Sequence, residues 1–163
     1  MKQEDKDLLL RDLCARLQYG VKIALKNNGS YHHDNVAKKG DITIDKLKGF
    51  TGSYFNIYHE NTLDWDWYDN DIDIEDIKPY LFPLSSMTEE QEKEISKRYN
   101  YHNYYDGLCI EITYHSEGYW DTDTSCNLQD YLWLEDFFNK NHFDYRGLIE
   151  KGLAIDATNK NIY

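Results

Sequence analysis

Two kinds of apolar periodicity follow one another along the chain, and their order limits the folds it can adopt. Between residues 6 and 17, Leu9, Leu10, Leu13 and Leu17 recur at the spacing of one helical face, and Gly20 supplies a C-terminal stop. Apolar residues at every second position then predict β-strands. The predicted strands cover residues 21–25, 41–47, 53–59, 72–77 and 108–115.

The remaining periodic segments predict helices in the second half of the chain. Thr88 and Gln91 form a capping box at the start of a helix over residues 88–99. Residues 127–140 predict another helix, with an apolar stripe that consists of Leu128, Tyr131, Leu132, Glu135 and Phe138. A short helix that contains Gly147 and Gly152 is expected over residues 143–154. This order predicts an α+β fold, with a small antiparallel sheet or partly closed barrel flanked by an N-terminal helix and C-terminal helices.

The length and composition favour one domain over residues 1–163. With 163 residues, 40% of them hydrophobic and no Pro-rich or Ser/Gly-rich linker, the chain is long enough to bury one core. The N-terminal leucine run is interrupted at Arg11, so neither a signal peptide nor a membrane span is expected there. The three cysteines form no C-x-x-C pattern, and we expect reduced thiols in or near the core of a cytoplasmic protein.

Charge is distributed unevenly along the chain. The net charge is −12, and residues 49–163 hold twenty-three Asp/Glu against eight Lys/Arg. No Lys or Arg occurs in residues 49–77 or in residues 99–139, and each of these segments holds eight carboxylates. A strongly negative face repels nucleic acid and membranes and attracts basic surfaces. We therefore expect a protein with a basic surface as the partner, with no direct nucleic-acid binding and no membrane association.

Aromatic side chains accompany the carboxylates in both segments. Exposed Trp and Tyr can stack on arginine and act as binding hot spots, while spaced carboxylates can imitate nucleic-acid phosphates. An ordinary surface strand would also place the tryptophans on one face, but it would mix charges of both signs. Residues 58–67 and 114–123 have similar sequences, and this similarity reflects either a diverged repeat or chance. The candidate binding residues are Asp64, Trp65, Asp66, Trp67, Tyr68, Asp69, Asp71, Asp73, Tyr119, Trp120, Asp121 and Asp123.

Metal and catalytic motifs are weak. Asp69, Asp71 and Asp73 match the first positions of a calcium loop, but Ile74 replaces the required glycine and Tyr80 the required bidentate carboxylate. Adjacent His32 and His33 lack a third ligand, and no nucleophile elbow or phosphate loop is present. We expect no metal site, no cofactor, no catalytic residues and no enzymatic activity.

Three segments of the chain resemble sequences of a known protein family. They are "LLLRDLCARLQYGVK" at residues 8–22, "FPLSSMTEEQ" at residues 82–91 and "NHFDYRGLIEKGLAIDA" at residues 141–157. The chain resembles uncharacterised small proteins encoded by gut Bacteroides-type bacteria and by their phages and prophages. The resemblance implies a mobile-element setting, in which small proteins that block host defences are common. It does not cover the acidic aromatic stretches.

These features together favour a non-enzymatic acidic binding protein of a phage or mobile element. We expect it to inhibit a host defence or nucleic-acid-handling protein, with nucleic-acid mimicry as one candidate mechanism. The alternative is a phage protein that binds and sequesters a nucleotide signal through basic residues in the N-terminal part. Those residues are Arg16, Lys22, Lys38, Lys39, Lys46 and Lys48. A structural component of a phage particle is a third possibility.

Overall fold

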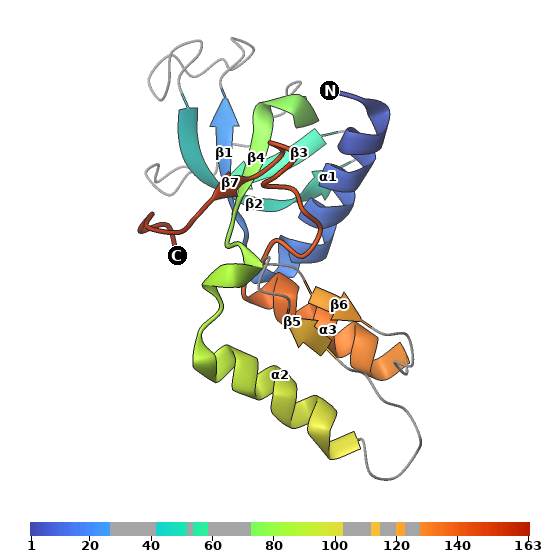
Figure 1. The fold of residues 1–163 in the computed structure, drawn as a ribbon. Coiled ribbons are helices and arrows are strands. Elements are labelled where there is room, and N and C mark those ends of the chain that lie inside the picture. Colours follow the sequence, from blue (N-terminus) through green and yellow to red (C-terminus); the bar gives the residue numbers. More distant parts are fainter. Residues whose placement is uncertain (27–41, 52–53, 59–72, 103–111, 115–119, 123–127) are drawn as a thin grey trace. The chain divides into compact units, whose positions relative to one another are not determined.

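The computed structural model describes seven stretches of the chain, shown in colour in Figure 1. They are residues 1–26, 42–51, 54–58, 73–102, 112–114, 120–122 and 128–163. These residues form two compact units. The first consists of Met1–Leu81 with Arg146–Tyr163, and the second of Phe82–Tyr145. The expectation of a single domain stays a prediction.

The first unit begins with the expected N-terminal helix. Helix α1 spans Gln3–Arg16 and continues as the 3-10 turn η1 over Leu17–Tyr19. Gly20 ends it in the left-handed region at φ 67°, which a glycine adopts without a Cβ penalty. Leu9 and Leu13 are fully buried, whereas Leu10 is exposed, so the buried stripe is narrower than the leucine pattern predicted.

A five-stranded sheet with strand order β3-β2-β1-β4-β7 completes this unit. The strands are β1 (Lys22–Lys26), β2 (Ile42–Thr51), β3 (Tyr54–Tyr58), β4 (Ile77–Leu81) and β7 (Ile155–Asp156). The first four pair in antiparallel fashion, and the short β7 adds in parallel beside β4. The sheet is open among the described residues, because β3 and β7 are different edge strands. The α+β class is therefore confirmed, with a small sheet and not a closed barrel.

Odd-numbered strand residues build the core of the first unit. Ile23, Leu25, Leu47, Ile77 and Leu81 are all at most 2% exposed and pack in one cluster with Leu9 and Leu13 of α1. The cluster also takes in Val21 and residues 148, 153 and 154 of the C-terminal segment. Because side chains alternate along a strand, the even-numbered residues of β1, β4 and the first half of β2 share the opposite face.

The strand expected over residues 72–77 is wrong in its position. Ile74–Asp76 form the 3-10 turn η2, and the strand begins only at Ile77. Asp73 accounts for the difference, because its Oδ1 accepts a hydrogen bond from the Glu75 N–H over 3.2 Å and starts the turn. Of the isoleucines in this pattern, Ile77 is a core residue of β4, whereas Ile74 is a half-buried residue of the turn η2.

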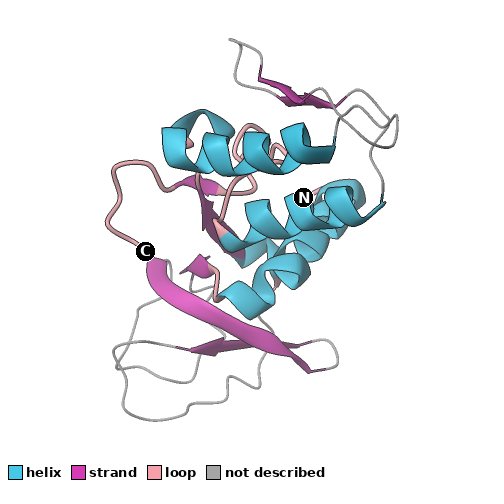
Figure 2. Ribbon diagram, turned by 90° about the horizontal axis from the view of Figure 1, so that it is seen from below, coloured by secondary structure: helices cyan, strands magenta, loops and turns pink. Residues whose placement is uncertain are grey.

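The second unit contains helices α2 (Glu89–His102) and α3 (Leu128–Lys140), coloured as helices in Figure 2. The 3-10 turn η3 (Leu84–Ser86) precedes α2, and β5 (Ile112–Tyr114) pairs with β6 (Trp120–Thr122) in a two-stranded sheet. The capping box is confirmed: Thr88 N–H donates to Gln91 Oε1 over 2.9 Å, and Gln91 N–H donates to Thr88 Oγ1 over 3.3 Å.

The apolar stripe predicted for α3 is partly wrong. Tyr131 is 53% exposed and Leu132 is 51% exposed. The buried residues are Asp130, Leu134, Phe137, Phe138 and Asn139, and the apolar members pack with Ile95 of α2 and Phe143. The aromatic packing selects this face, because Phe137 and Phe138 both contact the ring of Phe143.

The short helix expected over residues 143–154 is absent from this described segment. Turns replace it, and both of its glycines have φ 69°, which an α-helix cannot contain. Leu148 and Leu153 from these turns are buried in the core of the first unit. The glycines therefore reverse the chain, and one C-terminal helix, α3, remains of the two that were expected.

Candidate functional site

Most of the predicted acidic aromatic residues lie outside the described part of the chain. These are Asp64, Trp65, Asp66, Trp67, Tyr68, Asp69, Asp71, Tyr119 and Asp123. Trp120 and Asp121 lie on β6, where they pair in register with Tyr114 and Thr113 of β5. Asp73 is exposed and caps η2, so its carboxylate already has a local structural role.

Helix α3 is the longest described piece of the second segment without Lys or Arg, residues 99–139. Tyr131 and Leu132 project from it at 53% and 51% exposure, and Asp136 is also exposed one turn after Leu132. We call Tyr131, Leu132 and Asp136 the α3 outer face. Residues four apart on a helix are neighbours, so Leu132 and Asp136 lie side by side. Tyr131 projects about 100° away from Leu132 around the helix. Helix α3 therefore exposes a carboxylate beside an aliphatic side chain, and an aromatic ring on the adjoining side. The sequence analysis predicted carboxylates with aromatic rings at residues 64–73 and 119–123.

The opposite side of α3 is firmly held within the second unit. Arg98 of α2 lies 4.7 Å from the centroid of the Trp133 ring, and its Nη2 is 3.4 Å from Asp130 Oδ1. Asp130 is only 4% exposed, so this ion pair is shielded from solvent on the carboxylate side. Trp133 in turn stacks on Phe137 with the ring centroids 5.4 Å apart. Because the opposite side of α3 is packed in this way, we expect the helix to lose little conformational entropy when the outer face binds a partner.

A buried ionic cluster lies in the first unit, and the sequence analysis missed it. Asp12 and Arg16 are both 0% exposed and form two hydrogen bonds of 2.8 and 3.0 Å. Arg146 Nη1 donates to the same carboxylate over 2.9 Å. The i, i+4 spacing of Asp12 and Arg16 was the available signal. The cluster joins α1 to the C-terminal segment, and the guanidinium of Arg16 is enclosed in the protein.

A group of lysines shares the even-numbered face of the sheet. Lys22 pairs with Lys46, Lys26 with Ile42, and Ala24 with both Ile44 and Lys78. Directly paired residues of antiparallel strands point to the same side. We call this surface the lysine face and define it by Lys22, Lys26, Lys46, Lys78, Ile42 and Ile44. Of the six residues proposed for nucleotide capture, Lys22 and Lys46 lie on this face, whereas Arg16 is buried against Asp12 and does not line it. Lys38 and Lys39 lie outside the described residues, and Lys48 is described only as a backbone position of β2.

The described residues hold no cluster of three or more His, Cys, Asp or Glu side chains that could bind a metal ion. Of the proposed calcium positions, Asp73 caps η2 and Tyr80 is a buried residue of β4, while Asp69 and Asp71 lie outside the described chain. Cys14 is exposed on α1, so the expectation of a core thiol is wrong for this residue. Partial desolvation raises the pKa of its thiol, which lowers the thiolate fraction at neutral pH.

None of the described helices has the length and apolar character to cross a membrane. Comparison with known proteins found no matching family model, no matching curated protein and no matching solved structure. Function is therefore argued from the chain's own residues.

Proposed function

We propose that this protein is a non-enzymatic binding protein that recognises a host protein with a basic surface. The α3 outer face is the observation that carries the proposal. It presents an exposed tyrosine and leucine beside Asp136, and no Lys or Arg occurs between residues 99 and 139. Exposed Lys140 follows one turn after Asp136, so the attraction for cationic partners comes from the eight carboxylates of residues 99–139, and Tyr131 and Leu132 offer an apolar contact.

The two kinds of side chain make different contributions to binding. Carboxylates accelerate association with a basic partner through long-range attraction, and this effect declines as salt rises. Tyr131 and Leu132 slow dissociation, because aromatic and aliphatic side chains that become buried in an interface supply most of its binding energy. The candidate residues of the acidic loops, such as Trp65 and Asp66, would extend the same chemistry.

The proposed biological role is inhibition of a host defence or nucleic-acid-handling protein by a phage or mobile-element product, acting in the host cytoplasm. The resemblance to proteins of Bacteroides-type bacteria and their phages supports the setting. The carboxylate-rich segments support mimicry of nucleic acid, because proteins that bind phosphates present lysine and arginine to them. No cofactor enters this proposal.

A capture experiment with matched variants tests the proposal. The full chain is immobilised, a lysate of a Bacteroides-type bacterium is passed over it at low salt, and the enriched protein is identified and purified. Its Kd is then measured for wild type, Tyr131→Ala and Leu132→Ala. We expect each variant to weaken binding about tenfold, as hot-spot residues do.

Leu10→Ala is the matched control, because Leu10 is also a leucine exposed on a helix, at 40%. It should bind with the wild-type Kd. An unchanged Kd for both α3 variants would remove the α3 outer face from the interface. A captured protein with an acidic surface would contradict the proposed partner class.

A further inference from the structure

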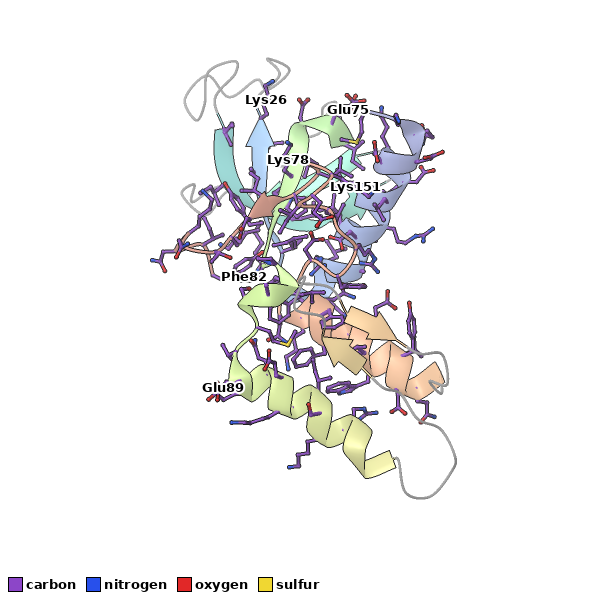
Figure 3. All side chains as sticks on the ribbon, in the orientation of Figure 1. Lys26, Glu75, Lys78, Phe82, Glu89 and Lys151 are labelled. Atoms are coloured by element: carbon purple, nitrogen blue, oxygen red, sulfur yellow. The ribbon has the colours of Figure 1, made fainter. Side chains whose placement is uncertain are left out.

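The lysine face of the first unit carries a charge opposite to that of the chain as a whole. Lys26 and Lys78 are exposed, and Figure 3 labels them on β1 and β4. The even-numbered positions of β1, β4 and the Ile42–Lys46 part of β2 contain four lysines and no carboxylate. In a protein of net charge −12 this is a concentrated positive surface.

Three lysines of this face have no acidic partner among the described residues. Lys26, Lys46 and Lys78 form no ion pair with a carboxylate in the described residues, although Lys6 and Lys93 each do so elsewhere. The Lys46 side chain lies across Gly20, where a Cβ would collide with its Cε and Nζ. The absence of a side chain at Gly20 therefore leaves room for the end of the Lys46 side chain.

Two isoleucines stand among these lysines. Ile42 is 65% exposed and Ile44 is 49% exposed, the two largest exposures of an isoleucine or leucine side chain apart from Leu132 in the described chain. Ile44 lies in the same row as Ala24 and Lys78, and Ile42 lies in the row of Lys26. Adjacent strands are about 4.8 Å apart, so each isoleucine lies within one or two strands of a lysine. A ligand of this face must therefore supply both negative charge and apolar groups.

We propose that the lysine face binds an extended acidic segment of another protein, in which every second residue faces the sheet and these residues include both carboxylates and apolar side chains. Carboxylates would pair with Lys26, Lys46 and Lys78, and apolar side chains would cover Ile42 and Ile44. The strand registers support this partner, because Lys26 shares a row with Ile42 and Lys78 shares a row with Ile44, so charged and apolar contacts lie side by side. The phosphates of a nucleotide would supply the negative charge but no aliphatic group to cover Ile42 and Ile44, which are 65% and 49% exposed.

This surface is distinct from the α3 outer face, and its test does not depend on the proposed function. The full chain is titrated at low salt with a fluorescent peptide in which every second residue is glutamate or leucine in turn, with serine between them, so that both kinds of side chain share one side. Binding is followed by anisotropy. The expected result is saturable binding that Lys26→Gln with Lys78→Gln weakens about five- to tenfold, because the double variant removes two exposed ion pairs. Ile42→Ser with Ile44→Ser should weaken binding with the lysines intact, which separates apolar contact from simple charge attraction.

The control is Lys93→Gln with Lys97→Gln, which removes two exposed lysines of α2. It should leave binding of the peptide unchanged. An equal loss of peptide affinity in this control would show that binding depends on the overall charge of the protein and not on the lysine face, and it would overturn the proposal. Failure of the peptide to bind would also overturn it, as would stronger binding of an oligothymidylate or displacement of the peptide by ATP through the same lysines.

Discussion

Asp12 and Arg16 are joined by a 2.8 Å hydrogen bond between Oδ2 and Nε, and both side chains are excluded from solvent. Arg146 reaches the same carboxylate from the C-terminal segment. One buried anion thus holds two guanidinium groups from distant parts of the chain. Removal of one member from such a group leaves charge uncompensated in a medium of low polarity.

We therefore predict that Asp12→Asn lowers the free energy of unfolding by about 3–5 kcal/mol. The asparagine keeps the size of the side chain but not its charge, so Arg16 and Arg146 lose their shared counter-ion. Urea denaturation measures the effect. Asp7→Asn is the control, because Asp7 is exposed on the same helix, and it should change stability by less than about 0.5 kcal/mol. Equal stabilities for the two variants would contradict a structural role for the cluster.

Two positions on α3 provide a second comparison. Phe138 is 5% exposed and packs on Phe143 and Tyr145, whereas Leu132 is 51% exposed. Phe138→Ala should cost about 3–5 kcal/mol, because it empties a packed aromatic site. Leu132→Ala should cost less than about 0.5 kcal/mol. Thermal and urea unfolding would reveal an error in the assigned face of α3 if Leu132→Ala were the more damaging change.

The contrast between Leu132 and Phe138 also shows how far the sequence could predict the fold. Local signals were sufficient for α1, its end at Gly20, the capping box of Thr88 and Gln91, and the range of α3. The buried face of α3 was not predictable from its own pattern, because that helix is apolar or aromatic on more than one side. The choice depends on Ile95 and Phe143, which come from other segments.

The site was harder to predict than the fold. An alternating pattern cannot distinguish Ile77, which is buried in β4, from Ile42 and Ile44, which are exposed on β2. Which face of the sheet is covered depends on α1 and on Leu148 and Leu153, and strand periodicity contains no information about them. The lysine face therefore emerged only from strand registers, and the pairing of Asp12 with Arg146 only from long-range packing.

The hydroxyl of Tyr163 leads to a prediction about alkaline pH. It accepts a hydrogen bond from Lys22 N–H over 3.2 Å and donates to the Tyr80 carbonyl over 2.8 Å. Although the residue is 45% exposed, desolvation of its hydroxyl raises the pKa of Tyr163 above its usual value. The unfolded chain therefore loses this proton first, and the stability contributed by the neutral hydroxyl is present below about pH 10 and is lost above it.

Tyr163→Phe should lower stability by about 1 kcal/mol at neutral pH, because both hydrogen bonds are lost. It should also make the decline in stability between about pH 9 and about pH 11 less steep than in wild type. Urea unfolding across this range measures both effects. Parallel pH profiles for the two proteins would show that the Tyr163 proton has the same pKa in both states.

Gly20 and Gly152 allow a comparison of backbone strain with and without a neighbouring side chain. Both have positive φ, but only Gly20 has Lys46 in the space of a Cβ. Each change to alanine should cost about 1–2 kcal/mol from the left-handed backbone. Gly20→Ala should not cost much more, because the flexible end of Lys46 can move aside. A much larger loss at Gly20, measured by urea unfolding, would show that Lys46 is fixed in place.

The proposed function requires that acidic and aromatic side chains recognise a basic protein. The most direct measurement is the association rate of the captured partner with wild type and with a variant in which Asp64, Asp66, Asp69, Asp71 and Asp73 are all asparagine. We predict slower association of the variant at low salt, with the difference shrinking toward about 0.5 M salt as screening increases. Equal association rates at low salt, with both proteins folded, would contradict the claim.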